Sequence, residues 1–312
     1  MSSTLEQTAG TPTHQPRATT RTRVKQVLEP YGFLTPTALL LVVLMFVPIF
    51  LVVQYSFFDN VIFNDDPVAV GLDNYVTVVS DPVFFTAVKN TAFFVVVSVA
   101  AHLVIGLGFA MLLNTSLVPD WIKAVFRSIY IMPWLFTVAI IAVLWRLLLN
   151  PNGIINYYLM EWGLVGQRVE WLASLDLSLY AVTFINIWAG YPFFMVSLLA
   201  GLQGIPDDLY EAAVVDGASG RQRFWNITLP QLKPIIISMA LLDAIWTSQQ
   251  FALIWLTTGG GPINVTEVLS TFTYKLAFSQ YEFALASTSA VLVLLMSMVL
   301  AVLYVRHQRA QG

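Results

Sequence analysis

Apolar residues fill six long runs of the chain, separated by shorter polar stretches. The hydrocarbon core of a bilayer is about 30 Å thick, and a helix needs about 20 residues to cross it. Lipid offers no partner for unpaired backbone groups, so each run must be helical. The pattern therefore predicts an all-α membrane protein with six transmembrane helices. The predicted spans are residues 36–58, 88–113, 124–149, 177–202, 235–256 and 283–305.

Lysine and arginine are distributed unevenly between the polar stretches. With the N-terminus inside, eleven of the 15 basic residues fall in cytoplasmic segments, and only Lys89, Arg146, Arg168 and Lys275 lie outside. Cytoplasmic loops carry an excess of basic residues. We therefore expect both termini, and the long polar loop of residues 204–234, to be cytoplasmic.

The composition agrees with a membrane protein. Of 312 residues, 57% are hydrophobic and 11% are charged, whereas soluble domains carry about 25% charged residues. Cysteine is absent, which excludes disulfides, thiolate metal sites and cysteine nucleophiles. Residues 1–30 are polar and are predicted to form a disordered cytoplasmic tail, followed by a transmembrane domain of residues 31–312. The first apolar run is too long for the core of a secretory signal peptide.

The predicted outer loops are residues 59–87, 150–176 and 257–282. Their aromatic residues and turn signals suit short interfacial helices, although loops that merely connect the spans remain an alternative. Within the second span, Gly106 and Gly108 would permit close helix packing. His102 in the same span is read as a hydrogen-bonded interior histidine, in preference to a ligand or proton relay.

The sequence contains no recognisable catalytic machinery. It has no P-loop, no His-Glu-x-x-His pattern and no evident Ser/His/Asp set. We therefore do not expect an enzyme, and the interpretation assigns no catalytic residue, metal site or cofactor to this chain. If the protein works against a gradient, the energy must come from an ion or from a partner.

A polar stripe in the fifth span is the first candidate site. An ionisable residue inside the membrane is a functional hypothesis by default. Asp243 is followed by Thr247 and Gln250 on the same helix face, and Trp246 borders that face. Carboxylate, hydroxyl and amide groups bind sugar hydroxyls, and an aromatic ring covers the C–H surface. Hydrogen bonding between helices is the alternative role.

The fourth span carries a second unusual segment, residues 188–193. Pro192 lacks an amide donor and is predicted to kink or break the helix, and Gly190 gives room for close approach. Interrupted helices near the midplane often line transport sites. Asn186, one turn earlier, would face the same cavity.

The loop of residues 204–234 is predicted to form two short helices. Pro206 suits a first turn, and acidic residues that follow it favour the positive end of a helix. Gly217 suits the position that ends the helix, and Ser219 can cap a second one. Leu229-Pro230 is predicted to end that second helix, since the residue before proline avoids the α region.

This loop resembles a known family motif. The letters EAA at 211–213, three residues, Gly217, nine residues and ITLP at 227–230 resemble the EAA loop of permease subunits of binding-protein-dependent ABC importers. The wider stretch 186–262 is similar to the sugar-transporting branch typified by maltose permeases. The resemblance implies a type I importer permease fold in a bacterial cytoplasmic membrane. It places contact with a cytoplasmic ATPase at Glu211, Ala212, Ala213, Asp216, Gly217, Ile227, Leu229 and Pro230.

The same resemblance implies the partners and the mode of action. Two permeases, usually different, would assemble with two ATPase subunits, which bind ATP and magnesium, and with an extracytoplasmic sugar-binding protein. Lipid surrounds the spans, and no nucleic acid is expected. Five positions match sugar contacts of the maltose-type permeases: Gly190, Phe193, Asp243, Thr247 and Gln250. With the residues argued above, the candidate substrate-binding set is Asn186, Gly190, Tyr191, Phe193, Asp243, Trp246, Thr247 and Gln250.

Asp243 also supports a different interpretation. Maltose-type permeases carry no acidic residue at this position, so maltose itself is not implied. An ion-coupled secondary transporter using Asp243 is the alternative function, but no internal repeat of the spans is evident. An intramembrane enzyme would need a clustered catalytic set. The sequence does not choose between sugars, polyols and glycerol phosphates, although a carboxylate would disfavour phosphorylated solutes.

Overall fold

The computed structural model describes residues 20–59, 61–62, 66–115 and 117–309. The chain divides into two compact units, Met1–Leu51 and Val52–Gly312. Helix α1 (Thr20–Tyr55) forms the described part of the first unit. Its apolar segment, Tyr31–Tyr55, is 25 residues long, which is enough to cross a membrane. The predicted disordered tail lies outside the described residues as far as residue 19, and α1 begins directly after that point.

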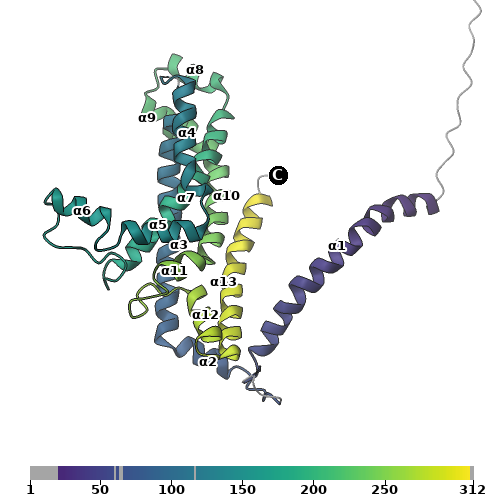
Figure 1. Cartoon of the computed structure of the whole chain (residues 1–312). Coiled ribbons are helices and arrows are strands. Elements are labelled where there is room, and N and C mark those ends of the chain that lie inside the picture. Colours follow the sequence, from purple (N-terminus) through teal and green to yellow (C-terminus); the bar gives the residue numbers. More distant parts are fainter. Residues whose placement is uncertain (1–19, 60, 63–65, 116, 310–312) are drawn as a thin grey trace, which may run out of the picture. The chain divides into compact units, whose positions relative to one another are not determined.

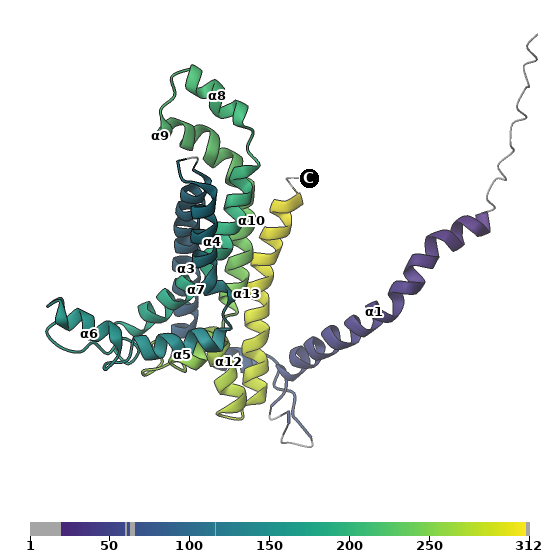
Figure 2. The ribbon, with the colours of Figure 1, turned by 45° about the horizontal axis from the view of Figure 1, so that its top comes forward.

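The second unit is a bundle of long helices with shorter helices at its ends (Figures 1 and 2). Both views place α8 and α9 at one end of the bundle and α2 and α12 at the opposite end. The helices are α2 (Asp73–Ser80), α3 (Pro82–Asn114), α4 (Asp120–Leu135), α5 (Val138–Leu148), α6 (Ile154–Glu161), α7 (Ser178–Gln203), α8 (Asp207–Val215), α9 (Gly220–Arg223), a π-helical turn η1 (Phe224–Thr228), α10 (Leu229–Ser248), α11 (Ala252–Thr257), α12 (Leu269–Phe278) and α13 (Phe283–Arg309).

The predicted all-α class is confirmed, since the described ranges contain helices and no strand. Within the described residues, five helical segments are long and apolar enough to span a membrane, and there are six spans if the bent pair α4–α5 counts as one. Short helices α2, α6 and α12 occupy the three predicted outer loops. The count of six therefore agrees with the sequence, but two of the spans differ in form from the prediction.

The third span is bent rather than straight. Helices α4 and α5 meet at an angle of 98°. Phe136 is extended between them, and the Thr137 hydroxyl accepts a hydrogen bond from the Ile140 amide at 3.4 Å to cap α5. A side-chain cap offers the backbone an alternative to continuing the previous helix. The bend brings residues of both short helices toward the interior of the bundle.

The fifth span begins earlier and ends earlier than predicted. An unbroken helical segment runs from Gly220 to Ser248, so the prediction that Leu229-Pro230 ends a helix was wrong. The π turn explains this, because the Leu229 amide donates to the carbonyl of Phe224, five residues back. This shifted hydrogen-bond register accommodates a proline in the first turn of α10. The span then breaks after α10, where the freed carbonyl of Gln250 accepts a hydrogen bond from Ser270 at 2.8 Å.

The fourth span is continuous, contrary to the predicted interruption. Helix α7 runs through Pro192 without a break. Along the next turns of α7, Phe194, Met195 and Leu198 are fully buried against neighbouring helices. Packed neighbours compensate for the hydrogen bond that a proline removes from a membrane helix. The interruptions therefore lie in the third and fifth spans instead.

Helices α3 and α7 pack closely at Gly106. A Cβ atom at this position would lie 2.5 Å from the Cβ of Phe194 and 2.9 Å from the backbone nitrogen of Met195. At Gly108, no described atom outside the adjacent backbone of α3 lies within 4 Å of the corresponding position. The predicted role in close packing is therefore confirmed for Gly106 and wrong for Gly108. The packing fixes where α3 presents its one interior histidine.

Candidate functional site

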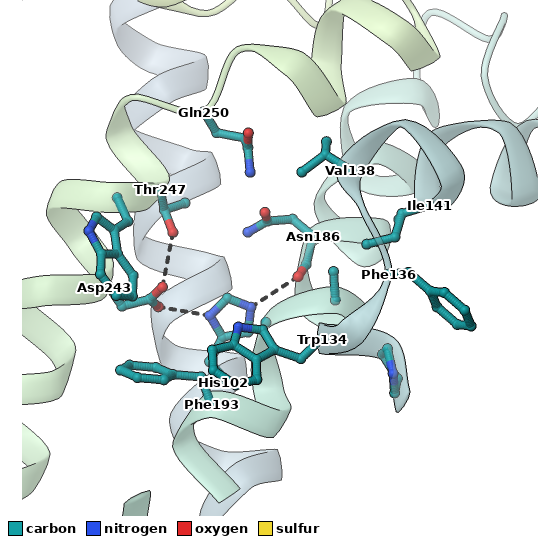
Figure 3. A pocket seen from close by; sticks show the side chains of 14 residues that line it. His102, Trp134, Phe136, Val138, Ile141, Asn186, Phe193, Asp243, Thr247 and Gln250 are labelled. Atoms are coloured by element: carbon teal, nitrogen blue, oxygen red, sulfur yellow. Dashed lines mark hydrogen bonds and ion pairs between the residues drawn. The ribbon is translucent and has the colours of Figure 1, made fainter. Parts of the chain in front are cut away.

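A cavity of about 260 Å³ lies between α3, α7, α10 and the bent pair α4–α5 (Figure 3). The bend between α4 and α5 closes one side, and the break after α10 contributes another part of the wall. The lining residues are His102, Pro133, Trp134, Phe136, Val138, Ile141, Asn186, Ala189, Gly190, Phe193, Asp243, Trp246, Thr247 and Gln250.

The polar stripe predicted on the fifth span faces this cavity. Asp243 and Thr247 are one helical turn apart on α10, and both are buried. The Thr247 hydroxyl donates to Oδ1 of Asp243 at 3.2 Å. Gln250 stands at the break that follows α10 and is half-buried. The helix break thus places a long amide side chain beside the shorter acid and hydroxyl (Figure 3).

Both ring nitrogens of His102 on α3 have a hydrogen-bond partner. Its Nδ1 lies 2.7 Å from Oδ2 of Asp243, and its Nε2 lies 3.1 Å from the backbone carbonyl of Asn186 (Figure 3). Only 2% of His102 and 7% of Asp243 is exposed. A Cβ at Gly190 would overlap the His102 ring, so only glycine admits the ring at this position. The prediction of a hydrogen-bonded interior histidine is confirmed. Its side-chain partner is Asp243, the ionisable residue predicted inside the fifth span.

One buried polar group of the lining has no hydrogen-bond partner among the described residues. Asn186 is 6% exposed, and its side-chain Nδ2 forms no hydrogen bond within the described part of the chain. Buried polar atoms are nearly always paired, so an unpaired one needs an explanation. Figure 3 shows this amide pointing into the space between Thr247 and Val138. A bound solute with hydroxyl oxygens would supply the missing acceptor.

Aromatic rings form another part of the lining. The ring centroid of Phe193 lies 6.0 Å from that of Trp134 and 5.4 Å from that of Trp246. Trp246 is 54% exposed within this chain. The cavity therefore combines a small polar group of side chains with a broad aromatic face, which is the usual composition of a small-molecule site.

A second candidate region lies at the end of the bundle that carries α8 and α9. Gly217 has φ of +76°, and the amides of Ala218 and Gly217 donate to the carbonyls of Ala213 and Val214 at 2.8 and 3.0 Å. These two bonds form a Schellman motif, which ends α8 as predicted. Ser219 caps α9, and its capping box with Gln222 confirms the predicted second helix.

The loop residues divide into an exposed set and an anchoring set. Glu211, Ala212 and Asp216 are exposed, as are Gly217 and Pro230. Ala213, Ile227 and Leu229 are half-buried, and Ile227 packs against the hydrophobic core. The hydroxyls of Tyr210 and Thr228 are hydrogen-bonded at 2.9 Å, which ties α8 to the π turn that leads into α10. A hydrogen bond therefore connects α8, which holds most of the exposed residues, to the helical segment that lines the cavity.

Residues 102–311 match the family model described as binding-protein-dependent transport system inner membrane component. The chain belongs to this family. The match covers more than half of the sequence and includes both candidate regions. The resemblance found through the EAA loop is therefore confirmed, and this inner membrane component is a multi-pass membrane protein and an ABC transporter permease.

Relatives and solved structures agree with this family. The chain is 34% identical to a probable ABC transporter permease of Bacillus subtilis over 278 residues, covering 89% of this chain and 94% of that protein. It is 35% identical to a trehalose/maltose transport system permease of Thermococcus litoralis over 284 residues, covering 89% and 93%. A chain from a bacterial ABC transporter involved in alginate import has the same fold, with a TM-score of 0.80, 24% identity and coverage of 92% and 99%.

The permease cavity contains seven of the eight residues in the predicted substrate-binding set. Tyr191 is the exception, because it is buried and its hydroxyl donates to the backbone carbonyl of Tyr130 at 3.0 Å. Sequence reasoning noted His102 but did not place it in the site. It missed Trp134, Phe136 and the other residues that the bend of α4–α5 brings in. Pro133 and Thr137, a helix breaker and a capping residue close together, were the available signal.

No metal site was predicted, and the described ranges contain no group of three or more His, Cys, Asp or Glu side chains arranged to hold a metal ion. His102 and Asp243 are the ionisable pair of the cavity.

Proposed function

We propose that this permease belongs to an ATP-driven importer and moves a sugar or related polyhydroxy solute from an extracytoplasmic binding protein into the cytoplasm. The unpaired amide of Asn186 carries the proposal, because it faces a cavity that also presents Thr247, Gln250 and an aromatic wall. Amides and hydroxyls bind sugar hydroxyls, and aromatic rings cover the C–H faces. The relative named for trehalose/maltose transport supports the same solute class.

The proposed assembly has two permeases, two cytoplasmic ATPase subunits that bind ATP and magnesium, and one binding protein. Glu211 and the other exposed residues of α8 would contact the ATPase at the cytoplasmic end of the bundle. The arrangement of the helices supports this topology, since α8–α9 and the short helices α2 and α12 lie at opposite ends (Figures 1 and 2). We place the assembly in a bacterial cytoplasmic membrane, with both termini of this chain inside.

Ion coupling through Asp243 is a weaker explanation. Both carboxylate oxygens already accept or share hydrogen bonds, Oδ1 with Thr247 and Oδ2 with His102. A coupling cation would have to displace one of these partners. Family membership also favours a partner ATPase as the source of energy.

Replacing Asn186 with leucine is expected to impair transport without destabilising the fold. The amide nitrogen has no hydrogen-bond partner in the described part of the chain, so its removal leaves none of these groups unsatisfied. Loss of one hydrogen bond to the solute should lower uptake on the order of tenfold. The measurement is uptake of trehalose and maltose by proteoliposomes that contain the assembled importer and its binding protein. The unfolding temperature of the purified chain is measured in parallel.

Asn156→Leu provides the matched control. The Asn156 side chain donates to the carbonyls of Asn150 and Val169 and accepts from the Val169 amide, all at 3.0–3.1 Å. Its loss should lower the unfolding temperature. The proposal is wrong if Asn186→Leu behaves like this structural control, or if its uptake equals wild type for every sugar that the importer carries.

A further inference from the structure

The cavity contains a buried acid, Asp243, that is hydrogen-bonded to a buried histidine, His102. Of the side chains that line it in the described part of the chain, only His102 and Asp243 are ionisable. We infer that His102 makes this site net neutral and thereby selects uncharged solutes over charged ones. This inference rests on the proposed transport function and names the substrate class more narrowly.

The positions of the protons follow from the partners of His102. A backbone carbonyl only accepts hydrogen bonds, so the Nε2 atom facing the Asn186 carbonyl at 3.1 Å must carry a hydrogen. The 2.7 Å contact between Nδ1 and Oδ2 of Asp243 needs one further proton between the two atoms. With that proton on nitrogen, the pair is an imidazolium and a carboxylate. With it on oxygen, the pair is a neutral imidazole and a carboxylic acid.

Both arrangements carry no net charge. A bare carboxylate facing an unprotonated Nδ1 would place two acceptors in contact, and burial makes such a pair strongly unfavourable. The ring cannot turn away, because it occupies the space left by Gly190 and lies against Phe194, with centroids 5.9 Å apart. His102 is therefore held where it neutralises Asp243.

The absence of net charge among the lining residues determines which solutes the cavity can bind. A charged solute would lose its water and find no opposite charge among the lining residues, which is costly in a low-dielectric site. An uncharged solute with hydroxyl groups can instead use the Asn186 amide, Gln250 and the aromatic wall. Phosphorylated and carboxylated sugars are therefore disfavoured because a countercharge is missing, and not because Asp243 carries an exposed negative charge.

Two substitutions separate charge balance from mere packing. His102→Gln leaves the Asp243 carboxylate without its proton-sharing partner, so uptake of an uncharged sugar should fall on the order of tenfold or more. In the double variant, H102Q/D243N, two amides can pair and no charge remains. It should recover most of the uptake lost in His102→Gln, with Asp243→Asn alone as the reference. Equal or greater loss in the double variant would contradict the charge-balance role.

The protonation of His102 can be measured without any solute. The chain has three histidines, at positions 14, 102 and 307, so His102→Gln identifies the resonances of residue 102 in nitrogen-15 NMR of the full-length chain in lipid nanodiscs. We expect a protonated Nε2, and an Nδ1 resonance that shifts in Asp243→Asn. An unprotonated Nε2 would overturn the inference, whatever the protein transports.

The substrate class is tested with a panel of probes. Proteoliposomes containing the complete importer are offered trehalose, maltose and glycerol, their charged counterparts glucuronate and glucose 6-phosphate, and uncharged solutes that are not sugars. Uptake of uncharged sugars or polyols alone supports both proposals. Uptake of a charged solute by the wild type contradicts the inference. Uptake confined to an uncharged solute outside the sugars and polyols supports the inference and contradicts the proposed sugar function.

Discussion

Glu211→Lys is expected to abolish ATP-dependent uptake while leaving the permease folded. Glu211 is exposed on α8, and its side chain forms no hydrogen bond or ion pair within the described ranges. In the proposed assembly it pairs with a basic residue of the ATPase. Lysine would place two positive charges together at that contact, which costs several kcal/mol at an interface. Uptake should fall to less than about one-tenth of wild type.

The measurement combines uptake in proteoliposomes with co-purification of the ATPase and the unfolding temperature of the purified chain. Glu211→Gln is the conservative comparison, because it removes the charge but keeps a hydrogen-bonding side chain. It should give an intermediate loss. Wild-type uptake in Glu211→Lys would refute the coupling role of α8, and a lowered unfolding temperature would show that the residue supports the fold instead.

Gly106→Leu is expected to give the largest loss of stability in the bundle. The Cβ alone would lie 2.9 Å from the backbone nitrogen of Met195, which cannot move without shifting α7. Overpacking of this kind should lower the free energy of unfolding by about 3 kcal/mol or more. His102 lies one turn earlier on α3, so the shift would also displace the histidine from Asp243 and impair uptake.

Gly108→Leu is the control on the same helix. No described atom outside the adjacent backbone of α3 lies within 4 Å of its Cβ position, and leucine is a better helix former than glycine. This variant should unfold at the wild-type temperature or above it. Thermal unfolding of the detergent-solubilised chain distinguishes the two. Equal stability of both leucine variants would contradict the close contact between α3 and α7.

Local signals predicted the parts of the structure that depend on neighbours in sequence. The six apolar runs, the left-handed Gly217 and the Ser219 cap are features of a few consecutive residues, and each was confirmed. The shared face of Asp243 and Thr247 follows from helical periodicity in the same way, whereas Gln250 lies beyond the end of α10 and reaches the cavity through the helix break.

Contacts between residues far apart in the sequence determine the features that the sequence pattern did not predict. His102 and Asp243 are 141 residues apart, and only the packing of α3 against α7 and α10 brings them together. The predicted effects of two prolines on their helices were wrong for a related reason. Pro192 is tolerated because α7 is packed along its length, and Pro230 because a π turn precedes it. Propensity describes an isolated helix, whereas neighbouring helices decide whether a proline breaks a membrane span.

The proposed function is import of a sugar with energy from a partner ATPase. Its most direct test is uptake of labelled trehalose or maltose by proteoliposomes that contain both permeases, the ATPase and the binding protein. We expect uptake only with ATP on the ATPase side, loss of uptake when the ATPase cannot hydrolyse ATP, and no effect of collapsing the proton gradient. Uptake that persists without the ATPase and disappears with the proton gradient would contradict the claim.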